Sequence, residues 1–358
     1  MTITAEAPAA PATVFHGVEE IDDNRWYLIG NLRLISSSTV AGVISKDALV
    51  RWAASLAAKA AFAELPTIVV ASRVKPCGNT GSKCAGEGGH EPAARCERCP
   101  CQQCKACIAR WIANRHVEHT ARRADEGTRV HDVAEWWSYH GEIKPYDADI
   151  APYVKSFEAF VAEYGLTPDD FLVSEAIVVN REAGYAGTCD GIVIFHADRT
   201  DAAAKLVARV TGIPAKQAAK RGITVVLVID FKTREGEGPQ FYPPQALQLT
   251  GYRHAQTIRI KNTDVEQPMI PTDGGLLVQL RPDGVTARLV LTDEDTYRDG
   301  FLPALATAKW VIERGPAAVS SRTFVLPETL AARRRKAARE TPAAGDAPAT
   351  ESISHPAA

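Results

Sequence analysis

The sequence lacks the features of secreted, membrane-spanning and histone-like proteins. Its N-terminus has neither the basic stretch nor the apolar stretch of a secretory signal, and its longest apolar run, around residues 225–229, is far shorter than the roughly 20 residues of a membrane span. The 41 Lys and Arg residues nearly balance 43 Asp and Glu residues, which excludes a basic field over the whole molecule. We therefore expect a cytoplasmic protein that has no membrane partner and holds any polyanion through a local patch.

The chain has enough apolar residues for a large core. Its 358 residues are 46% hydrophobic and 23% charged, which suits one elaborated domain of roughly 250–300 ordered residues with tails. Residues 1–15 are rich in Ala, Pro and Thr, and residues 315–358 are rich in Ala, Pro and basic side chains. We expect both ends to be disordered and residues 16–314 to form a single domain.

The hydrophobic period changes from helical to strand-like near Gly165. Helical spacing is found at 49–63, at 108–141 with an interruption at Gly127, and at 154–164, 244–259 and 295–314. Apolar alternation predicts a short strand at 26–34. Segments rich in Val and Ile predict strands at 171–179, 187–195 and 224–232, and a hairpin at 275–280 and 286–291. This order favours an α/β fold in which helices flank a mixed central sheet.

Two charged residues follow the most apolar of these predicted strands. Residues 225–232 read Val-Val-Leu-Val-Ile-Asp-Phe-Lys, so Asp230 and Lys232 lie two positions apart and project from one face. A carboxylate can hold a hard divalent cation while an ammonium orients an attacking water, as metal-assisted phosphodiester hydrolysis requires. For this pair alone, an ion pair without a chemical role is the alternative.

Further polar residues can join the same site. Asp190 lies in an apolar segment where an unpaired charge would be costly, and it converges with Asp230 if the two strands are neighbours. The alternative is a turn aspartate before Gly191. Gln248 and Tyr252 are four residues apart, on one face of a predicted helix, and His131 lies in another. Each of these side chains alone is ordinary for a helix surface.

Taken in order, these motifs resemble the RecB-type branch of the PD-(D/E)XK nuclease superfamily, which includes CRISPR-associated RecB-like exonucleases of phages. The matching segments are Gly127-Thr128-Arg129-Val130-His131, Glu175, Gly187-Thr188-Cys189-Asp190-Gly191, Asp230-Phe231-Lys232-Thr233, and Gln248 to Tyr252. The resemblance covers about residues 120–260 and implies a restriction-endonuclease-like core. Cys189 stands where the superfamily name has a proline, which leaves every chemical role in place.

The resemblance also implies a role for each residue. Magnesium or manganese would be held by His131, Asp190, Asp230 and the Phe231 carbonyl, and Lys232 would act on the water. Gln248 and Tyr252 would position the substrate. Glu175 is similar to an extra acid that some members use, with a salt bridge at the strand edge as the alternative.

A cysteine-rich insertion at 73–110 predicts a second metal site. Seven of the eight cysteines fall within residues 77–107, and clustered thiols in a reducing compartment hold metal more often than they form disulfides. The candidate ligands are Cys77, Cys84, Cys96, Cys99, Cys101, Cys104, Cys107 and His90. The Cys-x-x-Cys spacings favour structural zinc. An iron–sulfur cluster is the alternative, although no cysteine follows Cys189 to complete the arrangement usual in relatives.

Residues 73–123 carry ten Lys and Arg against four Asp and Glu, which indicates a local patch for phosphates. We expect a metal-dependent DNA nuclease, with exonuclease action because no separate sequence-reading motif is present. The resemblance further implies phage DNA processing, recombination or repair in a bacterial host cytoplasm. No P-loop is found, so unwinding would need a helicase or recombination partner. The alternative is a non-catalytic, zinc-containing nucleic-acid-binding module on a nuclease-like scaffold.

Overall fold

A computed structural model describes residues 15–21, 24–44, 47–72, 105–261, 263 and 265–318. The chain divides into two units, residues 1–308 and 309–358. The first unit holds the sheet and all the candidate site residues described below. In the second unit, the described residues form the π-helical turn η4 (Trp310–Arg314) and the short helix α11 (Gly315–Ala318). The expected tails at 1–15 and 315–358 lie almost entirely outside the described residues.

The described residues of the first unit form one mixed sheet. Its strands are β1 (Phe15–Ile21), β2 (Asn24–Ile29), β3 (Leu32–Ser36), β4 (Phe171–Asn180), β5 (Tyr185–His196), β6 (Thr224–Thr233), β7 (Thr257–Arg259), β8 (Glu266–Pro268), β9 (Gly274–Arg281) and β10 (Gly284–Val290). Strand β5 pairs antiparallel with β4 along one edge and with β6 along the other, and it pairs parallel with β3 near its start. Strand β6 is parallel to β9, which forms a hairpin with β10. The strands predicted from residue 171 onwards are thereby confirmed.

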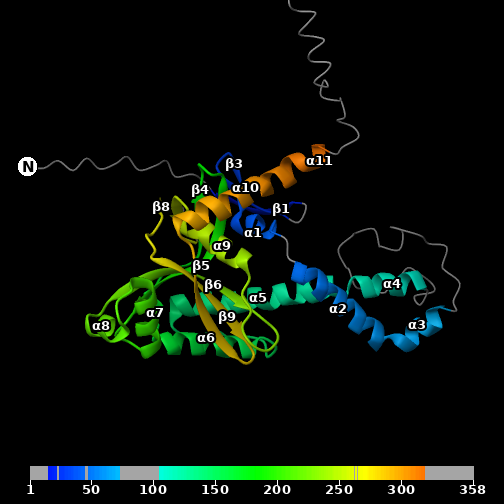
Figure 1. Ribbon diagram of the computed structural model, residues 1–358, viewed down its shortest axis with the longest axis horizontal. Coiled ribbons are helices and arrows are strands. Elements are labelled where there is room, and N and C mark those ends of the chain that lie inside the picture. Colours follow the sequence, from blue (N-terminus) through cyan, green and yellow to red (C-terminus); the bar gives the residue numbers. More distant parts are fainter. Residues whose placement is uncertain are drawn as a thin grey trace, which may run out of the picture. The chain divides into compact units, whose positions relative to one another are not determined.

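Helices cover both faces of this sheet, whereas α2 (Asp47–Ala63), α3 (Leu65–Ser72) and α4 (Lys105–Ala113) lie apart from it (Figure 1). The other helices are α1 (Ser37–Gly42), α5 (Arg115–His140), α6 (Ala151–Tyr164), α7 (Asp201–Thr211), α8 (Ala215–Lys220), α9 (Pro243–Arg253) and α10 (Leu302–Lys309), with the turns η2 (Pro168–Asp170) and η3 (Thr296–Phe301). Leu227 and Ile229 of β6 pack in a core with α5, α6 and α7, whereas Val228 between them packs in a core with α9. This alternation confirms the expected α/β fold with a mixed central sheet flanked by helices.

Local chemistry explains where several helices begin and end. The side chain of Ser36 caps α1 by accepting a hydrogen bond from the Thr39 amide. Helix α5 ends at Gly141 and α6 ends at Gly165, and both glycines have left-handed backbone conformations that close a helix without steric cost.

Three expectations about local structure are wrong. Helix α5 continues through Gly127 without the predicted interruption. The helix predicted at 244–259 ends at Arg253, because the following residues turn into β7, which pairs with β4. The apolar alternation at 26–34 belongs to the hairpin of β2 and β3 rather than to one strand. In each case a contact distant in the sequence overrides a local pattern.

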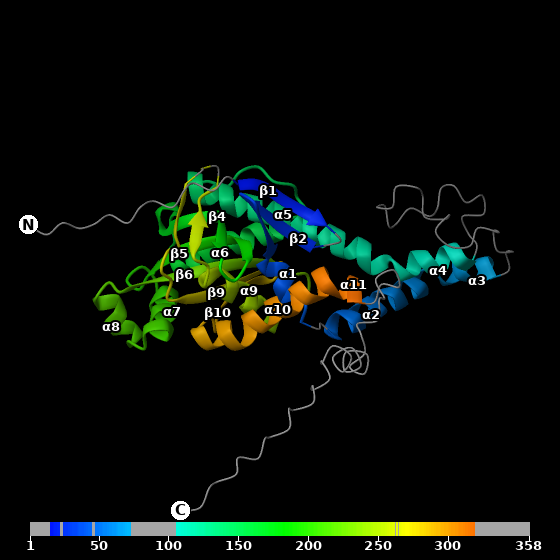
Figure 2. The same ribbon diagram turned by 90° about the horizontal axis from the view of Figure 1, so that it is seen from above.

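Helix α5 connects two parts of the first unit. Figures 1 and 2 both show it running from beneath the sheet to α2 and α4. Its second half contributes Val130, Val133 and Ala134 to the core under the sheet. Its first half lies beside α2, where the rings of Trp52 and His119 meet edge to face with 5.2 Å between their centroids. No helix in the described part of the chain has the length and apolar character needed to cross a membrane.

Candidate metal centre

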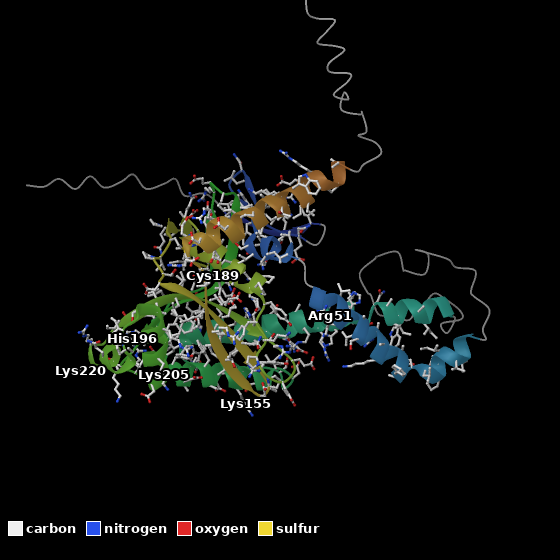
Figure 3. All side chains as sticks on the ribbon, in the orientation of Figure 1. Arg51, Lys155, Cys189, His196, Lys205 and Lys220 are labelled. Carbon is white, nitrogen blue, oxygen red and sulfur yellow. The ribbon has the colours of Figure 1, made fainter. Side chains whose placement is uncertain are left out.

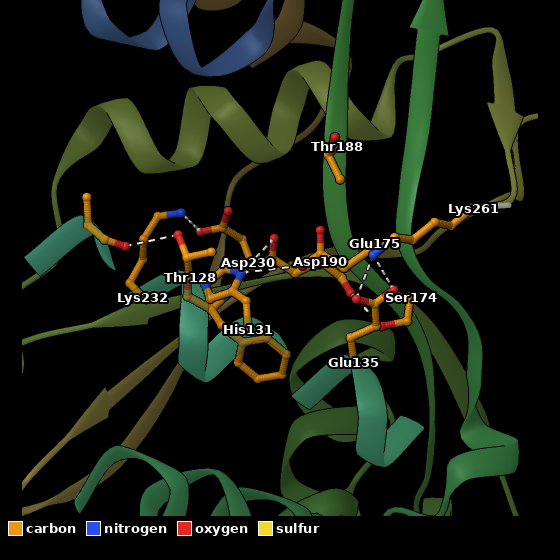
Figure 4. Close-up of polar contacts among 12 residues, drawn as sticks. Thr128, His131, Glu135, Ser174, Glu175, Thr188, Asp190, Asp230, Lys232 and Lys261 are labelled. Atoms are coloured by element: carbon orange, nitrogen blue, oxygen red, sulfur yellow. Dashed lines mark hydrogen bonds and ion pairs between the residues drawn. The ribbon is translucent and has the colours of Figure 1, made fainter. Parts of the chain in front are cut away.

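The candidate site lies where β4, β5 and β6 meet helix α5 (Figure 4). Strand β5 contributes Asp190 and β6 contributes Asp230, and the two strands are antiparallel neighbours as the sequence predicts. Strand β4 contributes Glu175, and α5 contributes His131. The ligand atoms of His131, Glu175 and Asp190 all lie within 4.8 Å of one another. The structure therefore gathers four side chains that are up to 99 residues apart in the sequence.

Glu175 has an unusual backbone conformation. Its neighbour Ser174 pairs with Gly191, and Ala176 pairs with Cys189, so Glu175 lies opposite Asp190 in the register. The φ angle of Glu175 is 48°, the only positive value at a non-glycine residue in the described part of the chain. Such strain costs on the order of 1–3 kcal/mol and concentrates at functional sites. The backbone is thus strained at the residue that brings the carboxylates of Glu175 and Asp190 together.

His131 bridges these acids and the backbone of β6. Its Nδ1 lies 3.4 Å from Glu175 Oε1 and 3.5 Å from Asp190 Oδ1. Its Nε2 lies 3.1 Å from the carbonyl oxygen of Phe231. Burial lowers the pKa of His131, but Asp190 and Glu175 outweigh it and raise the pKa well above the ordinary value. Without a metal ion, the ring is therefore a cation between two acids at neutral pH, and a metal ion bound to it would displace a ring proton.

The two acids that face His131 differ in their electrostatics. Burial raises the pKa of Asp190, but the charge of His131, Lys232 and the Phe231 amide, which donates to Asp190 Oδ2 at 2.6 Å, outweigh burial and lower it. Burial dominates at Glu175 and raises its pKa, although His131 opposes this effect. Asp190 is therefore the more firmly ionised of the two.

Asp230 is the most deeply buried of the acids, with no exposed surface. Its Oδ2 lies 2.5 Å from Lys232 Nζ, and its Oδ1 accepts a hydrogen bond from Gln248 Nε2 at 3.1 Å. The same amide group lies 2.6 Å from the hydroxyl oxygen of Tyr252. The expected pairing of Asp230 with Lys232 on one strand face, and of Gln248 with Tyr252 on one helix face, is thereby confirmed.

The environment of Asp230 disfavours the charged form of its carboxyl group. Burial raises its pKa to about 6, since the opposing charge of Lys232 does not fully compensate and Asp190 adds repulsion. Burial lowers the pKa of Lys232, but the carboxylates of Asp230 and Asp190 outweigh it and raise the pKa, so the amine is charged at neutral pH. The site therefore places three carboxylates against two cationic side chains.

Two glycines permit these close approaches. A Cβ atom on Gly127 would lie 3.3 Å from Thr233 Oγ1, so glycine lets α5 pass close to the end of β6 one turn before His131. A Cβ atom on Gly187 would lie 2.5 Å from the ring of Tyr252, so glycine makes room for that ring over β5. The sequence pattern treats Gly127 as a helix interruption, but its role is packing.

The donor set fits a hard divalent cation. Carboxylates, one imidazole and a backbone carbonyl are ligands that magnesium and manganese accept. Asp230 Oδ2 is buried, and its close partner in the described part of the chain is the Lys232 ammonium at 2.5 Å. A carboxylate oxygen can accept from two directions, so a bound cation would add a second partner.

Three neighbouring residues were missed by the sequence analysis. Lys261 Nζ lies 2.6 and 2.7 Å from the two carboxylate oxygens of Glu135, beside Glu175 in Figure 4. The hydroxyl of Tyr139 donates to the Ser174 carbonyl at 3.2 Å. Glu135 follows His131 by one helical turn, a spacing that could have drawn attention to it, whereas nothing in the sequence links Lys261 to α5.

The cysteine-rich insertion is not tested by the structure. Cys77, Cys84, His90, Cys96, Cys99, Cys101 and Cys104 lie outside the described residues, and of Cys107 only the backbone, in α4, is described. Zinc or an iron–sulfur cluster at these residues stays a prediction.

No protein-family model matches the chain, and no curated protein matches it.

Proposed function

We propose that this chain is a metal-dependent deoxyribonuclease that hydrolyses phosphodiester bonds and acts from DNA ends. The observation that carries the proposal is the strained Glu175 opposite Asp190, with His131 across from both. Asp230, which carries a buried carboxylate beside a charged lysine, adjoins this group. A module that only binds nucleic acid has no need of buried acids whose charges repel one another.

His131, Glu175, Asp190, Asp230 and the Phe231 carbonyl would hold magnesium or manganese. Bound there, the cation would supply Lewis-acid polarisation of the phosphate. Hydrolysis forms a bond between a water oxygen and phosphorus, breaks the bond to the leaving oxygen, and transfers a proton to that oxygen.

The protein's own residues would organise the water and the charge. Lys232 is a charged donor held by Asp230, so it would orient the water and stabilise the negative charge that develops on the phosphate. Gln248 fixes the other oxygen of Asp230 and contacts Tyr252, so this pair would keep Asp230 in position while the substrate binds.

Digestion of DNA tests this function directly. Linear and circular DNA, single- and double-stranded, would be incubated with magnesium, manganese or EDTA. Asp190→Asn and Lys232→Ala should abolish digestion, whereas Glu158→Gln and Lys155→Ala, exposed positions on α6, should not (Figure 3 labels Lys155).

The outcomes separate the activities. Loss of cleavage in EDTA and resistance of circular DNA would support a metal-dependent exonuclease. Equal digestion by the site variants and the control variants would assign the activity to a contaminant and overturn the proposal. Cutting of circular DNA would retain the hydrolysis and reject the requirement for ends.

A further inference from the structure

The end of β6 and the loop after it follow α5 in register. The Phe231 carbonyl meets His131, Thr233 passes Gly127, and Glu235 reaches the previous turns of the helix. Two strand residues advance about 6.6 Å and four helix residues advance about 6.0 Å, so the two segments stay in step. The end of β6 and the loop after it therefore run beside α5 from the metal centre to Glu235.

Glu235 meets a histidine and an arginine of α5. Its Oε2 lies 3.2 Å from His119 Nε2 and 3.8 Å from Arg122 Nη2. We call His119 and Arg122 the α5 pair. They belong to the basic region that the sequence analysis marked at 73–123, and Arg51 adds an exposed cation on the adjacent helix α2 (Figure 3).

The loop that carries Glu235 is folded around a guanidinium group. Arg234 donates hydrogen bonds to the Gly238 carbonyl at 2.5 Å and to Gln240 Oε1 at 2.8 Å. The Gly238 amide in turn donates to Asp283 at 3.1 Å. These contacts hold the loop in addition to the ion pairs of Glu235.

The ion pair between Glu235 and Arg122 is too exposed to contribute much to stability. The side chain of Glu235 is 55% exposed and that of Arg122 is 60% exposed. Exposed ion pairs are weak because water and salt compete for both partners. Arg122 Nε also lies 3.6 Å from Glu126 Oε1 on the same helix, so a ligand with several negative charges would displace Glu235 and share Arg122 with Glu126.

We propose that the α5 pair, His119 and Arg122, binds a backbone phosphate of the DNA strand, and that Glu235 occupies this position as an internal competitor until DNA displaces it. The nature of the ligand rests on the proposed function. The pair lies nine to twelve residues before His131, which is about 14–18 Å along the helix. Successive phosphates of one strand advance about 3.4 Å along the duplex axis and are further apart in space because the strand winds around it, so the phosphate bound here is at most about five nucleotides from the one at the metal centre.

Binding of fluorescent DNA duplexes to the full chain in EDTA tests this proposal without cleavage. Glu235→Gln should tighten binding about two- to fivefold, since it removes a competitor with the strength of an exposed ion pair. Arg122→Ala should weaken binding and reduce the dependence of log affinity on log salt concentration by about one. Arg122→Lys, which keeps the charge, should restore most of the affinity.

Two matched controls and a length series sharpen the test. Glu237→Gln changes the same charge in the same loop, and Lys205→Ala removes an exposed cation from α7, labelled in Figure 3. Both should leave affinity unchanged. Duplexes that extend about one base pair beyond the cleaved bond should not respond to Arg122→Ala, whereas duplexes that extend about eight base pairs beyond it should.

Each outcome bears on one proposal. Equal affinities for Glu235→Gln and Glu237→Gln, an unchanged salt dependence in Arg122→Ala, or no DNA binding at all would overturn the phosphate site. If the variants shift binding as expected but magnesium and manganese support no cleavage, the phosphate site stands and the nuclease proposal fails. If DNA is cut and the variants bind like their controls, the nuclease proposal stands and the phosphate site fails.

Discussion

Replacing Asp230 with asparagine should stabilise the metal-free protein. The pKa of this buried carboxyl group is raised from 3.8 to about 6, mainly by burial. Folding therefore disfavours its charged form, and the penalty grows as pH rises from 3.8 to about 6 and is constant above that. Each unit of pKa shift corresponds to about 1.4 kcal/mol. At pH 7, ionised Asp230 thus lowers the free energy of unfolding by about 3 kcal/mol relative to a neutral side chain.

Asp170 provides a matched comparison with the opposite sign. This buried carboxylate pairs with Arg199 and accepts hydrogen bonds from the amide and hydroxyl of Thr167. Burial raises the pKa of Asp170, but Arg199 and Thr167 outweigh burial and lower it. Its charge therefore stabilises the fold at neutral pH, and this contribution is lost as pH falls through the lowered folded pKa. Asp170→Asn should destabilise the protein by on the order of 2 kcal/mol at pH 7.

Urea unfolding in EDTA, followed by tryptophan fluorescence at pH 7 and pH 4, measures both effects. For a slope of about 3 kcal/mol per molar urea, Asp230→Asn should raise the midpoint by about 1 M at pH 7. That gain should largely vanish at pH 4, and excess magnesium should stabilise the wild type but not the variant. A lower midpoint for Asp230→Asn at pH 7 would refute the reasoning that this aspartate is held in an unfavourable charged state.

Three further changes have distinct expected results. Glu175→Gln keeps the left-handed backbone and removes the carboxylate, so manganese affinity, measured by calorimetry, should fall at least about tenfold. Gly187→Ala places a Cβ atom 2.5 Å from the Tyr252 ring, so the free energy of unfolding should fall by about 1–3 kcal/mol, which thermal denaturation would show. Cys104→Ser should lower the zinc or iron content found by elemental analysis while DNA cleavage persists, and a visible iron–sulfur absorption would reject zinc.

Periodicity predicted much of the fold and part of the site. The strand period of two correctly placed Asp230 beside Lys232, and the helical period correctly placed Gln248 beside Tyr252. Both relations are local, since they depend on residues within one element. The apolar strands β4, β5 and β6 were also recognisable because each is rich in Val and Ile.

Contacts between different helices and strands could not be predicted from the sequence pattern. The left-handed conformation of Glu175 depends on how β4 pairs with β5, and no local signal marks it. Gly127 looked like a helix interruption because its packing partner, Thr233, lies on a distant strand. The pairing of Lys261 with Glu135 joins a loop to α5 across 126 residues. Such contacts arise from tertiary packing, which overrides local propensity.

Direct binding of manganese, followed by electron paramagnetic resonance, tests the central claim most closely. Manganese prefers oxygen and nitrogen ligands over the thiolates of the cysteine-rich insertion, so its signal reports on the carboxylate site. We expect one tight manganese ion per chain in the wild type and in the Glu158→Gln control, and at least about tenfold weaker binding in Asp190→Asn and His131→Ala. Equal manganese affinity in all four proteins would show that these residues do not form a metal centre.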